Sequence, residues 1–239
     1  RPHLARGCRS VTIAPVVHVF ADADAQAQAL AAAVAARLRE AIAARAGAWL
    51  AVPGGETPKK FLAALAQENL DWPRLNVTLT DERLVPADDA RSNVRLLREA
   101  LLDRVPAAFV PLVDAQSGKV DLSAAAAKRA QIFDVVVLGM GTDGHCASLF
   151  ADGDNIDAAL RADADVPVMR MRSPSVPEAR VTLTLSALVA TRALFVLICG
   201  AEKRRTLEHA LSGAEPPAHA PIRAVLEHAA AVAQFYWSP

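Results

Sequence analysis

One short segment carries the clearest chemical signal in the chain: residues 133–145, which read FDVVVLGMGTDGH. Its first half is apolar and contains three consecutive valines, a pattern typical of a strand that is buried on both faces. The strand runs into a glycine-rich loop that ends in Asp143, Gly144 and His145. A histidine at such a tip, where we expect a helix to begin, is accessible to solvent and suited to proton transfer near neutral pH. The loop therefore predicts chemistry as well as binding.

A second strand end carries a loop suited to a phosphate group. Gly54, Gly55 and Thr57 stand at the start of a predicted helix, and Pro58 fits its first turn. Glycines let the backbone approach an anion closely, and the unpaired N–H groups at the start of a helix attract it. Because the loop lacks the Gly-Lys-Ser/Thr ending of a nucleotide-binding P-loop, a simple tight turn is the alternative.

A third loop, which begins at Asp81, combines acidic and basic side chains. Arg83 is suited to bidentate phosphate contacts, and Asp81 to orienting a substrate hydroxyl or a catalytic residue. Farther along, Arg180 opens a predicted strand and Lys203 opens a predicted helix, so either could complete a phosphate pocket. The alternative for each is an ordinary solvated position. Because loops that follow neighbouring parallel strands meet at one edge of a sheet, we expect a shared pocket there.

Two other interpretations of the glycine-rich loop are weaker. Residues 139–144 spell the G-x-G-x-x-G pattern of dinucleotide-binding loops, but the next predicted strand is followed by Arg172 instead of an acid that could hold a ribose. Cys146 follows His145 directly, yet adjacent residues on a helix point about 100° apart and do not pair easily. We therefore expect no nicotinamide or flavin cofactor and interpret Cys146 as a packing residue.

Composition narrows the class of protein. The 239 residues include 26 basic and 26 acidic side chains, and this balance gives no electrostatic footprint for nucleic acid or an anionic membrane. No apolar run approaches the ~20 residues of a membrane span. The three cysteines are widely spaced and the histidines show no metal-ligand spacing, so we expect neither a disulfide framework nor a metal site. A reducing cytoplasm fits best, and residues 1–10 are expected to be a disordered or non-native start without a signal peptide.

The elements that must position these side chains alternate between strands and helices, which predicts a single α/β domain over residues 11–239. We expect a mostly parallel, Rossmann-like sheet flanked by helices. The expected strands span residues 11–20, 49–52, 75–80, 133–138, 166–171, 181–185, 193–199 and 232–237. The expected helices span residues 21–46, 94–102, 202–211 and 221–227, and Ser92-Asn93 could cap the second of these.

Five segments, taken in order, resemble the 6-phosphogluconolactonase family, which shares its fold with glucosamine-6-phosphate deaminases. They are GGETP (54–58), TDERLVP (80–86) with Ser92-Asn93, LGMGTDGH (138–145) followed by ASLF (147–150), RVTL (180–183) and GAEK (200–203). The resemblance implies a NagB/RpiA/CoA-transferase-like fold. It also implies hydrolysis of 6-phosphoglucono-1,5-lactone to 6-phosphogluconate, in the oxidative pentose phosphate pathway, without a metal or cofactor. The expected partner is this small sugar-phosphate lactone, and we expect a monomer or a weak homo-oligomer.

The resemblance also implies roles for particular residues. His145 is the expected general base that activates a water molecule, and Asp143 or Asp81 would orient the imidazole or the water. Backbone N–H groups of the glycine loops would stabilise the oxyanion. The residues expected to bind the substrate and its phosphate are Gly54, Gly55, Thr57, Arg83, Gly141, Arg180 and Lys203.

Some positions depart from the family's pattern. Pro53 stands where the family commonly has a serine, which removes one possible phosphate contact, and Cys146 and Ala151 replace its threonine and proline. The related deaminases carry a glutamate five residues after the histidine, whereas this chain has Phe150, which cannot transfer protons. Lactone hydrolysis is therefore favoured over deamination or isomerisation. A non-catalytic sugar-phosphate sensor is the other alternative, which the intact Asp-Gly-His tip disfavours.

Overall fold

Seven parallel strands form the central sheet. The computed structural model describes residues 16–113, 132–213, 216, 219–229 and 233–239, so the expected start at residues 1–10 lies outside the described part. Every neighbouring pair in the sheet is parallel, which confirms the predicted α/β class. In order across the sheet, the strands are β1 (Val16–Val19), β10 (Gln234–Ser238), β9 (Leu194–Cys199), β6 (Val135–Gly139), β2 (Ala48–Val52), β3 (Leu75–Leu79) and β5 (Ala108–Phe109).

A second, smaller sheet lies beside the carboxyl end of β3. It has the order β4-β8-β7 and is antiparallel throughout. Its strands are β4 (Asp81–Arg83), β8 (Arg180–Leu183) and β7 (Val168–Met171). The interpretation of residues 81–83 as a loop is therefore wrong, because these residues pair with β8. The expected strands 166–171 and 181–185 exist as β7 and β8, but they belong to this sheet and not to the parallel one.

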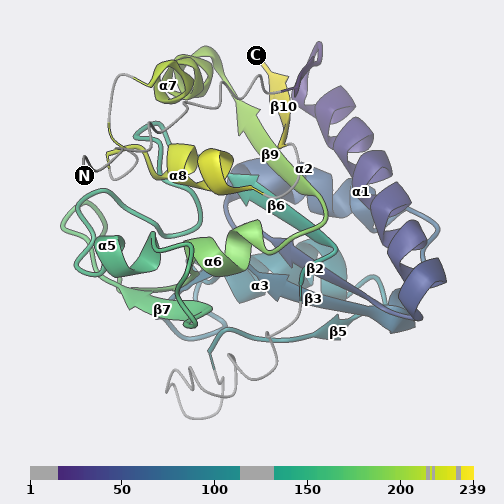
Figure 1. Cartoon of the computed structure of the whole chain (residues 1–239). Helices are drawn as coiled ribbons and strands as arrows, with labels where there is room; N and C mark the ends of the chain where they lie inside the picture. Colours follow the sequence, from purple (N-terminus) through teal and green to yellow (C-terminus); the bar gives the residue numbers. More distant parts are fainter. Residues whose placement is uncertain (1–15, 114–131, 214–215, 217–218, 230–232) are drawn as a thin grey trace, which may run out of the picture.

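Helices cover both faces of the parallel sheet, and Figure 1 shows α6 and α8 in front of its strands and α2 behind them. The long helices match the predicted ones, whereas α5, α6 and the single turn η1 were not predicted from the sequence. The helices are α1 (Ala23–Arg45), α2 (Glu56–Leu65), η1 (Trp72–Arg74), α3 (Asn93–Leu97) with its π-helical continuation η2 (Arg98–Leu102), α5 (Ile156–Ala159), α6 (Leu185–Val189), α7 (Ala201–Ser212) and α8 (Pro221–His228).

Local signals explain where α1 begins and ends. The carboxylate of Asp22 accepts hydrogen bonds from the backbone N–H groups of Asp24 and Ala25, at 3.0 and 2.8 Å, and so caps the first turn. The helix ends at Ala46, which takes a left-handed conformation with φ of 60° and donates its N–H to the carbonyl of Ile42. Buried leucines and alanines along the helix pack onto the sheet.

The core lies between the sheet and its helices, and β6 runs through its middle. The side chains of residues 135–138 are all fully buried, as the three consecutive valines predicted. The strand therefore holds the loop that follows it at the carboxyl edge of the sheet, the edge where α/β proteins bind ligands.

Candidate active site

A cavity of about 370 Å³ opens at the carboxyl edge of the parallel sheet. Residues in or directly after β2, β6 and β9 of the large sheet, and β4 and β8 of the small one, line this cavity. All of the predicted site residues except Asp143 line it: Gly54, Gly55, Thr57, Asp81, Arg83, Gly141, His145, Arg180 and Lys203. The three loops that the sequence singled out therefore meet in one place.

Asp143 stands behind His145 and holds its imidazole. Oδ1 of Asp143 lies 2.6 Å from Nδ1 of His145, and it also accepts the backbone N–H of His145 at 3.2 Å. The hydrogen bond from His145 lowers the pKa of the Asp143 carboxyl below its usual range, so this group is ionised near neutral pH. Because Nδ1 is bound to the carboxylate, Nε2 is the ring nitrogen that can act on a water molecule or a substrate.

The turn after His145 is not the helix that the sequence suggested. Cys146 and Leu149 form an antiparallel bridge, and Ala147 between them has a positive φ of 49°. Cys146 is completely buried, and burial raises the pKa of its thiol, so its sulfur is a poor nucleophile. The interpretation of Cys146 as a packing residue agrees with these surroundings.

Gly141 leaves the space that the His145–Asp143 pair occupies. A Cβ atom at Gly141 would lie 2.3 Å from Nδ1 and Cε1 of His145 and 2.4 Å from Oδ1 of Asp143. The N–H of Gly141 already donates to the carbonyl of His145 at 2.9 Å, which closes the loop on itself. Gly141 therefore contributes to the site by its small size, and its N–H is not available to a substrate.

Asp81 lines the cavity but is bonded to other partners than His145. Its Oδ2 accepts a hydrogen bond from the buried hydroxyl of Ser148 at 2.6 Å, and its carbonyl accepts one from Nδ2 of Asn93 at 3.0 Å. Of the two carboxylates that the sequence offered as partners of the imidazole, Asp143 is the one in contact with it.

The end of the cavity at the small sheet is cationic. In the pairing of β4 with β8, Arg83 stands directly opposite Arg180, whose side chain is only 9% exposed. Burial, followed by the charge of Arg83, lowers the pKa of the Arg180 guanidinium. Within the described part of the chain, the Nε atoms of both arginines are buried without a hydrogen-bond partner. Two partly buried like charges with donors to spare are the arrangement that an anion would complete.

Lys203 adds a third positive charge from the first turn of α7. It lines the same cavity and makes no ion pair with the described residues. Gly55, which lines the same cavity, precedes α2 with a φ of 97°, a conformation that favours glycine, and no side chain caps the first N–H groups of this helix. Unpaired N–H groups at the start of a helix are suited to binding an anion.

Sequence reasoning gave no role in the site to two buried residues that hold these loops together. The side-chain oxygen of Asn93 fills the space above Gly54, where a Cβ atom would lie 2.0 Å from it. Glu82 accepts hydrogen bonds from the backbone N–H groups of Asn93 and Val94, both at 2.8 Å, and from the hydroxyl of Ser92 at 3.1 Å. The signal available in the sequence was the position of Glu82 at the end of a predicted strand, ten residues before the capping residue Ser92.

A buried parallel sheet with a histidine–aspartate pair and a cationic pocket at its carboxyl edge defines an enzyme architecture for small anionic substrates. Residues 21–237 match the family model described as glucosamine-6-phosphate isomerases/6-phosphogluconolactonase. The chain belongs to this family.

Relatives and solved structures of similar fold agree with membership of this family. A 6-phosphogluconolactonase of Rhizobium meliloti (strain 1021) is 42% identical over 229 residues, which cover 93% of this chain and 98% of that protein. A crystal structure of a putative 6-phosphogluconolactonase from Neisseria gonorrhoeae FA 1090 aligns with a TM-score of 0.87 and 34% identity, covering 94% of this chain and all of that one. A monomeric glucosamine-6-phosphate deaminase aligns with a TM-score of 0.73 at 18% identity, covering 93% of this chain and 97% of that one, and it shows the shared fold alone.

The described residues contain neither a cluster suited to a metal ion nor a helix suited to spanning a membrane. Among them, no group of three or more histidine, cysteine, aspartate or glutamate side chains is placed to hold a metal ion. None of the helices in the described part of the chain is long and apolar enough to cross a membrane.

Proposed function

We propose that this protein hydrolyses 6-phospho-D-glucono-1,5-lactone to 6-phospho-D-gluconate, a step of the oxidative pentose phosphate pathway. The observation that carries this proposal is that His145, held by Asp143, lines the same cavity as Arg83 and Arg180. The histidine supplies a base, and the arginines supply an anchor for a phosphate group. Membership of the family and the named relatives support the same reaction.

Water activation starts at His145. Neutral Nε2 takes a proton from a water molecule as the water oxygen bonds to the lactone carbonyl carbon, and the negative charge of Asp143 stabilises the imidazolium that forms. The carbonyl oxygen becomes an oxyanion, which donors in the glycine loops stabilise. When the intermediate collapses, the bond between this carbon and the ring oxygen breaks. The imidazolium then returns its proton to the departing ring oxygen, and the carboxylic acid product ionises in water.

Phosphate binding places the lactone carbonyl at the base. Arg83, Arg180 and Lys203 neutralise the phosphate charge, and the N–H groups at the start of α2 near Gly55 and Thr57 donate to its oxygens. The cavity of about 370 Å³ has the size of a small-ligand site. Binding energy from the remote phosphate thus orients the reacting end.

Asp81 has a separate role from the base. Its carboxylate lines the cavity and is held by Ser148, so it is placed to accept hydrogen bonds from sugar hydroxyls. Asp143 is the group that orients His145.

Phe150 favours hydrolysis over the deaminase reaction of the same fold. Its ring lines the cavity and lies 4.6 Å, centroid to centroid, from the imidazole of His145. The place where a second proton-transferring carboxylate would be useful is therefore taken by an apolar ring. We further propose a cytoplasmic enzyme that acts as a monomer or weak homo-oligomer, which sedimentation of the purified protein would measure.

The test compares two substrates with the same purified protein. Freshly generated 6-phosphogluconolactone should be hydrolysed faster than in buffer, and glucosamine 6-phosphate should release no ammonia. Ammonia release without lactone hydrolysis would assign the chain to the deaminases. Tight binding of 6-phosphogluconate with neither activity would make it a sensor.

A further inference from the structure

Arg91 connects to both arginines of the anion site, although it does not line the cavity. Its backbone carbonyl accepts a hydrogen bond from Nη1 of Arg83 at 2.5 Å. Its side chain forms a fork with Asp89, with Nε and Nη2 at 3.0 and 2.9 Å from the two carboxylate oxygens. The third nitrogen, Nη1, donates to Oε1 of Glu178 at 2.5 Å.

Glu178 stands between Arg91 and Arg180. Its carboxylate is mostly buried, with 12% of the side chain exposed. One oxygen lies 2.5 Å from Arg91, whereas the other lies 3.6 Å from Nη2 of Arg180, too far for a strong hydrogen bond. Glu178 therefore binds Arg91 and leaves Arg180 only loosely paired.

The preference of Glu178 for Arg91 over Arg180 matters because a carboxylate competes with a phosphate for the same guanidinium. If Glu178 closed onto Arg180, the two side chains would form a bidentate pair. The carboxylate would then occupy the N–H donors of Arg180 and neutralise the charge of its guanidinium. Such a pair would be strong at a buried site, since little water screens it. An anion-binding arginine thus needs the neighbouring carboxylate to be engaged elsewhere.

We propose that Arg91 is a positioning residue for the anion site: it engages Glu178 and so keeps this carboxylate from neutralising Arg180. The inference rests on the proposed function only in taking the ligand of Arg180 to be a phosphate group. The fork with Asp89 fixes the guanidinium of Arg91 at the distance from which it can engage Glu178. Hydrogen bonding to Arg91 lowers the pKa of Asp89 to about 2, so the fork stays ionised throughout the neutral range.

The decisive experiment uses two variants and their combination. In Arg91→Ala, Glu178 is released and closes onto Arg180, so KM for 6-phosphogluconolactone should rise roughly three- to tenfold, as for coupled neighbouring groups, with kcat little changed. Adding Glu178→Gln to this variant removes the competing charge, and KM should return toward the value of Glu178→Gln alone. The backbone carbonyl of Arg91, which holds Arg83, is present in every variant.

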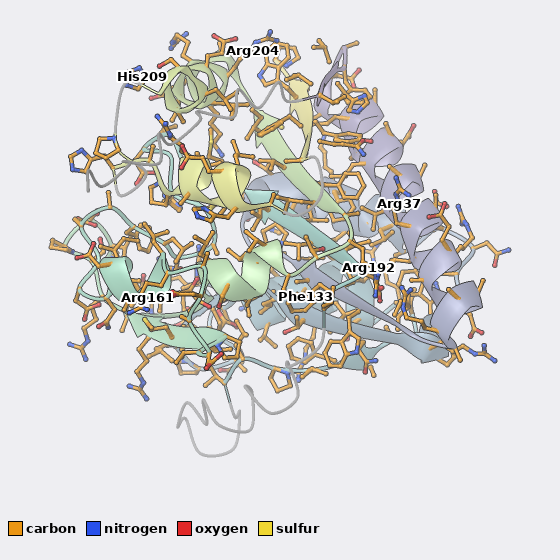
Figure 2. The ribbon with its side chains drawn as sticks, in the orientation of Figure 1. Arg37, Phe133, Arg161, Arg192, Arg204 and His209 are labelled. Atoms are coloured by element: carbon orange, nitrogen blue, oxygen red, sulfur yellow. The ribbon has the colours of Figure 1, made fainter. Side chains whose placement is uncertain are left out.

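Arg161→Ala is the matched control. Arg161, labelled in Figure 2, forms the same fork with an aspartate two residues away, at 3.1 Å for both contacts with Asp163, and does not line the cavity. Each variant loses one arginine–aspartate fork, but only Arg91→Ala also releases Glu178. Hydrolysis of the phosphate-free lactone, glucono-1,5-lactone, should be the same in Arg91→Ala and Arg161→Ala.

Inorganic phosphate binding, measured by calorimetry, gives a readout that needs no turnover. Weaker phosphate binding by Arg91→Ala than by Arg161→Ala, restored in the double variant, supports the inference even if wild-type protein proves inactive on the lactone. Equal phosphate affinity in Arg91→Ala and Arg161→Ala, or a double variant weaker than either single one, would overturn it. Arg91→Gln keeps the bulk of the side chain, and should Arg91→Ala not fold, the same comparisons decide the matter with this variant.

Discussion

Oδ1 of Asp143 contacts two atoms of His145: the ring nitrogen Nδ1 at 2.6 Å and the backbone nitrogen at 3.2 Å. Because only Gly144 separates the two residues, and has a positive φ of 81°, the loop bends back and brings the carboxylate to the ring nitrogen Nδ1. A tight turn thus places the proposed base and its proposed orienting group within three consecutive residues. The proposed mechanism therefore depends on the shape of that turn.

His145→Ala should lower kcat for the lactone by about 10²–10⁴-fold, the usual contribution of a positioned general base. The side chain is partly exposed, so its removal should not lower the melting temperature much. Steady-state kinetics with a circular dichroism melt would measure both. His18→Ala, a change in β1 outside the cavity, is the control. Turnover near that of wild type in His145→Ala would remove this residue from the mechanism.

Gly141→Ala should lower kcat strongly while KM changes little. The added methyl group would lie 2.3 Å from the imidazole and would displace it or Asp143, whereas the phosphate site is untouched. Gly47→Ala is the matched control, since its methyl group would meet only a carbonyl oxygen at 3.4 Å. Equal kcat values for the two variants would show that the pair tolerates displacement.

Lys203→Ala should mainly raise KM, by roughly five- to fiftyfold for the loss of a charge-assisted hydrogen bond. The lysine lines the cavity and binds the phosphate in the proposed complex, but it takes no part in proton transfer. Arg180→Ala should act in the same direction. Lys60→Ala is the control, because this lysine is paired with Asp24 outside the cavity. If KM for the phosphorylated lactone is unchanged in Lys203→Ala, that residue does not bind the phosphate.

The contribution of Glu82 to the free energy of unfolding should decrease as pH rises, whereas that of most carboxylates increases. Burial raises the pKa of Glu82 above its ordinary value of 4.5, outweighing the backbone N–H groups that donate to it. The folded protein therefore binds this proton more tightly than the unfolded chain. Its contribution to the free energy of unfolding is full below the unfolded pKa and is lost as pH rises through the raised folded value.

Urea denaturation of wild type and Glu82→Gln at several pH values between about 4 and 7 measures this contribution. The free energy of unfolding of wild type, minus that of the variant, should fall as pH rises. Glu99→Gln is a control of opposite sign, because hydrogen bonding to Arg95 lowers the pKa of Glu99. A difference between wild type and Glu82→Gln that does not vary with pH would contradict the assignment.

Most of the central sheet was predictable because its strands carry strong local signals, whereas the two-residue strand β5 was not predicted. The valines before Gly139 and the apolar run that ends at Cys199 are typical of buried strands, and α1 is delimited by Asp22 and Ala46. The small sheet was not predictable in the same way. Residues 81–83 read DER, and such a polar strand exists only because β8 pairs with it.

The pocket was predictable residue by residue, but the connections behind it were not. The types and positions of His145, Arg83 and Lys203 suggest their chemistry, and the topology of a parallel sheet brings such loops together. Nothing in the spacing shows that Asp143 and not Asp81 contacts the imidazole, or that Glu178 lies between Arg91 and Arg180. The first relation depends on the conformation of one loop, and the second on tertiary packing between segments distant in sequence.

Lactone hydrolysis by a base that needs no metal can be tested directly with the purified protein. Freshly generated 6-phosphogluconolactone would be added to wild type and to His145→Ala in buffer with EDTA, with spontaneous hydrolysis subtracted. We predict rapid hydrolysis by wild type that EDTA leaves unchanged, and nearly none by the variant. Hydrolysis by well-folded wild-type protein no faster than in buffer alone would contradict the proposed function.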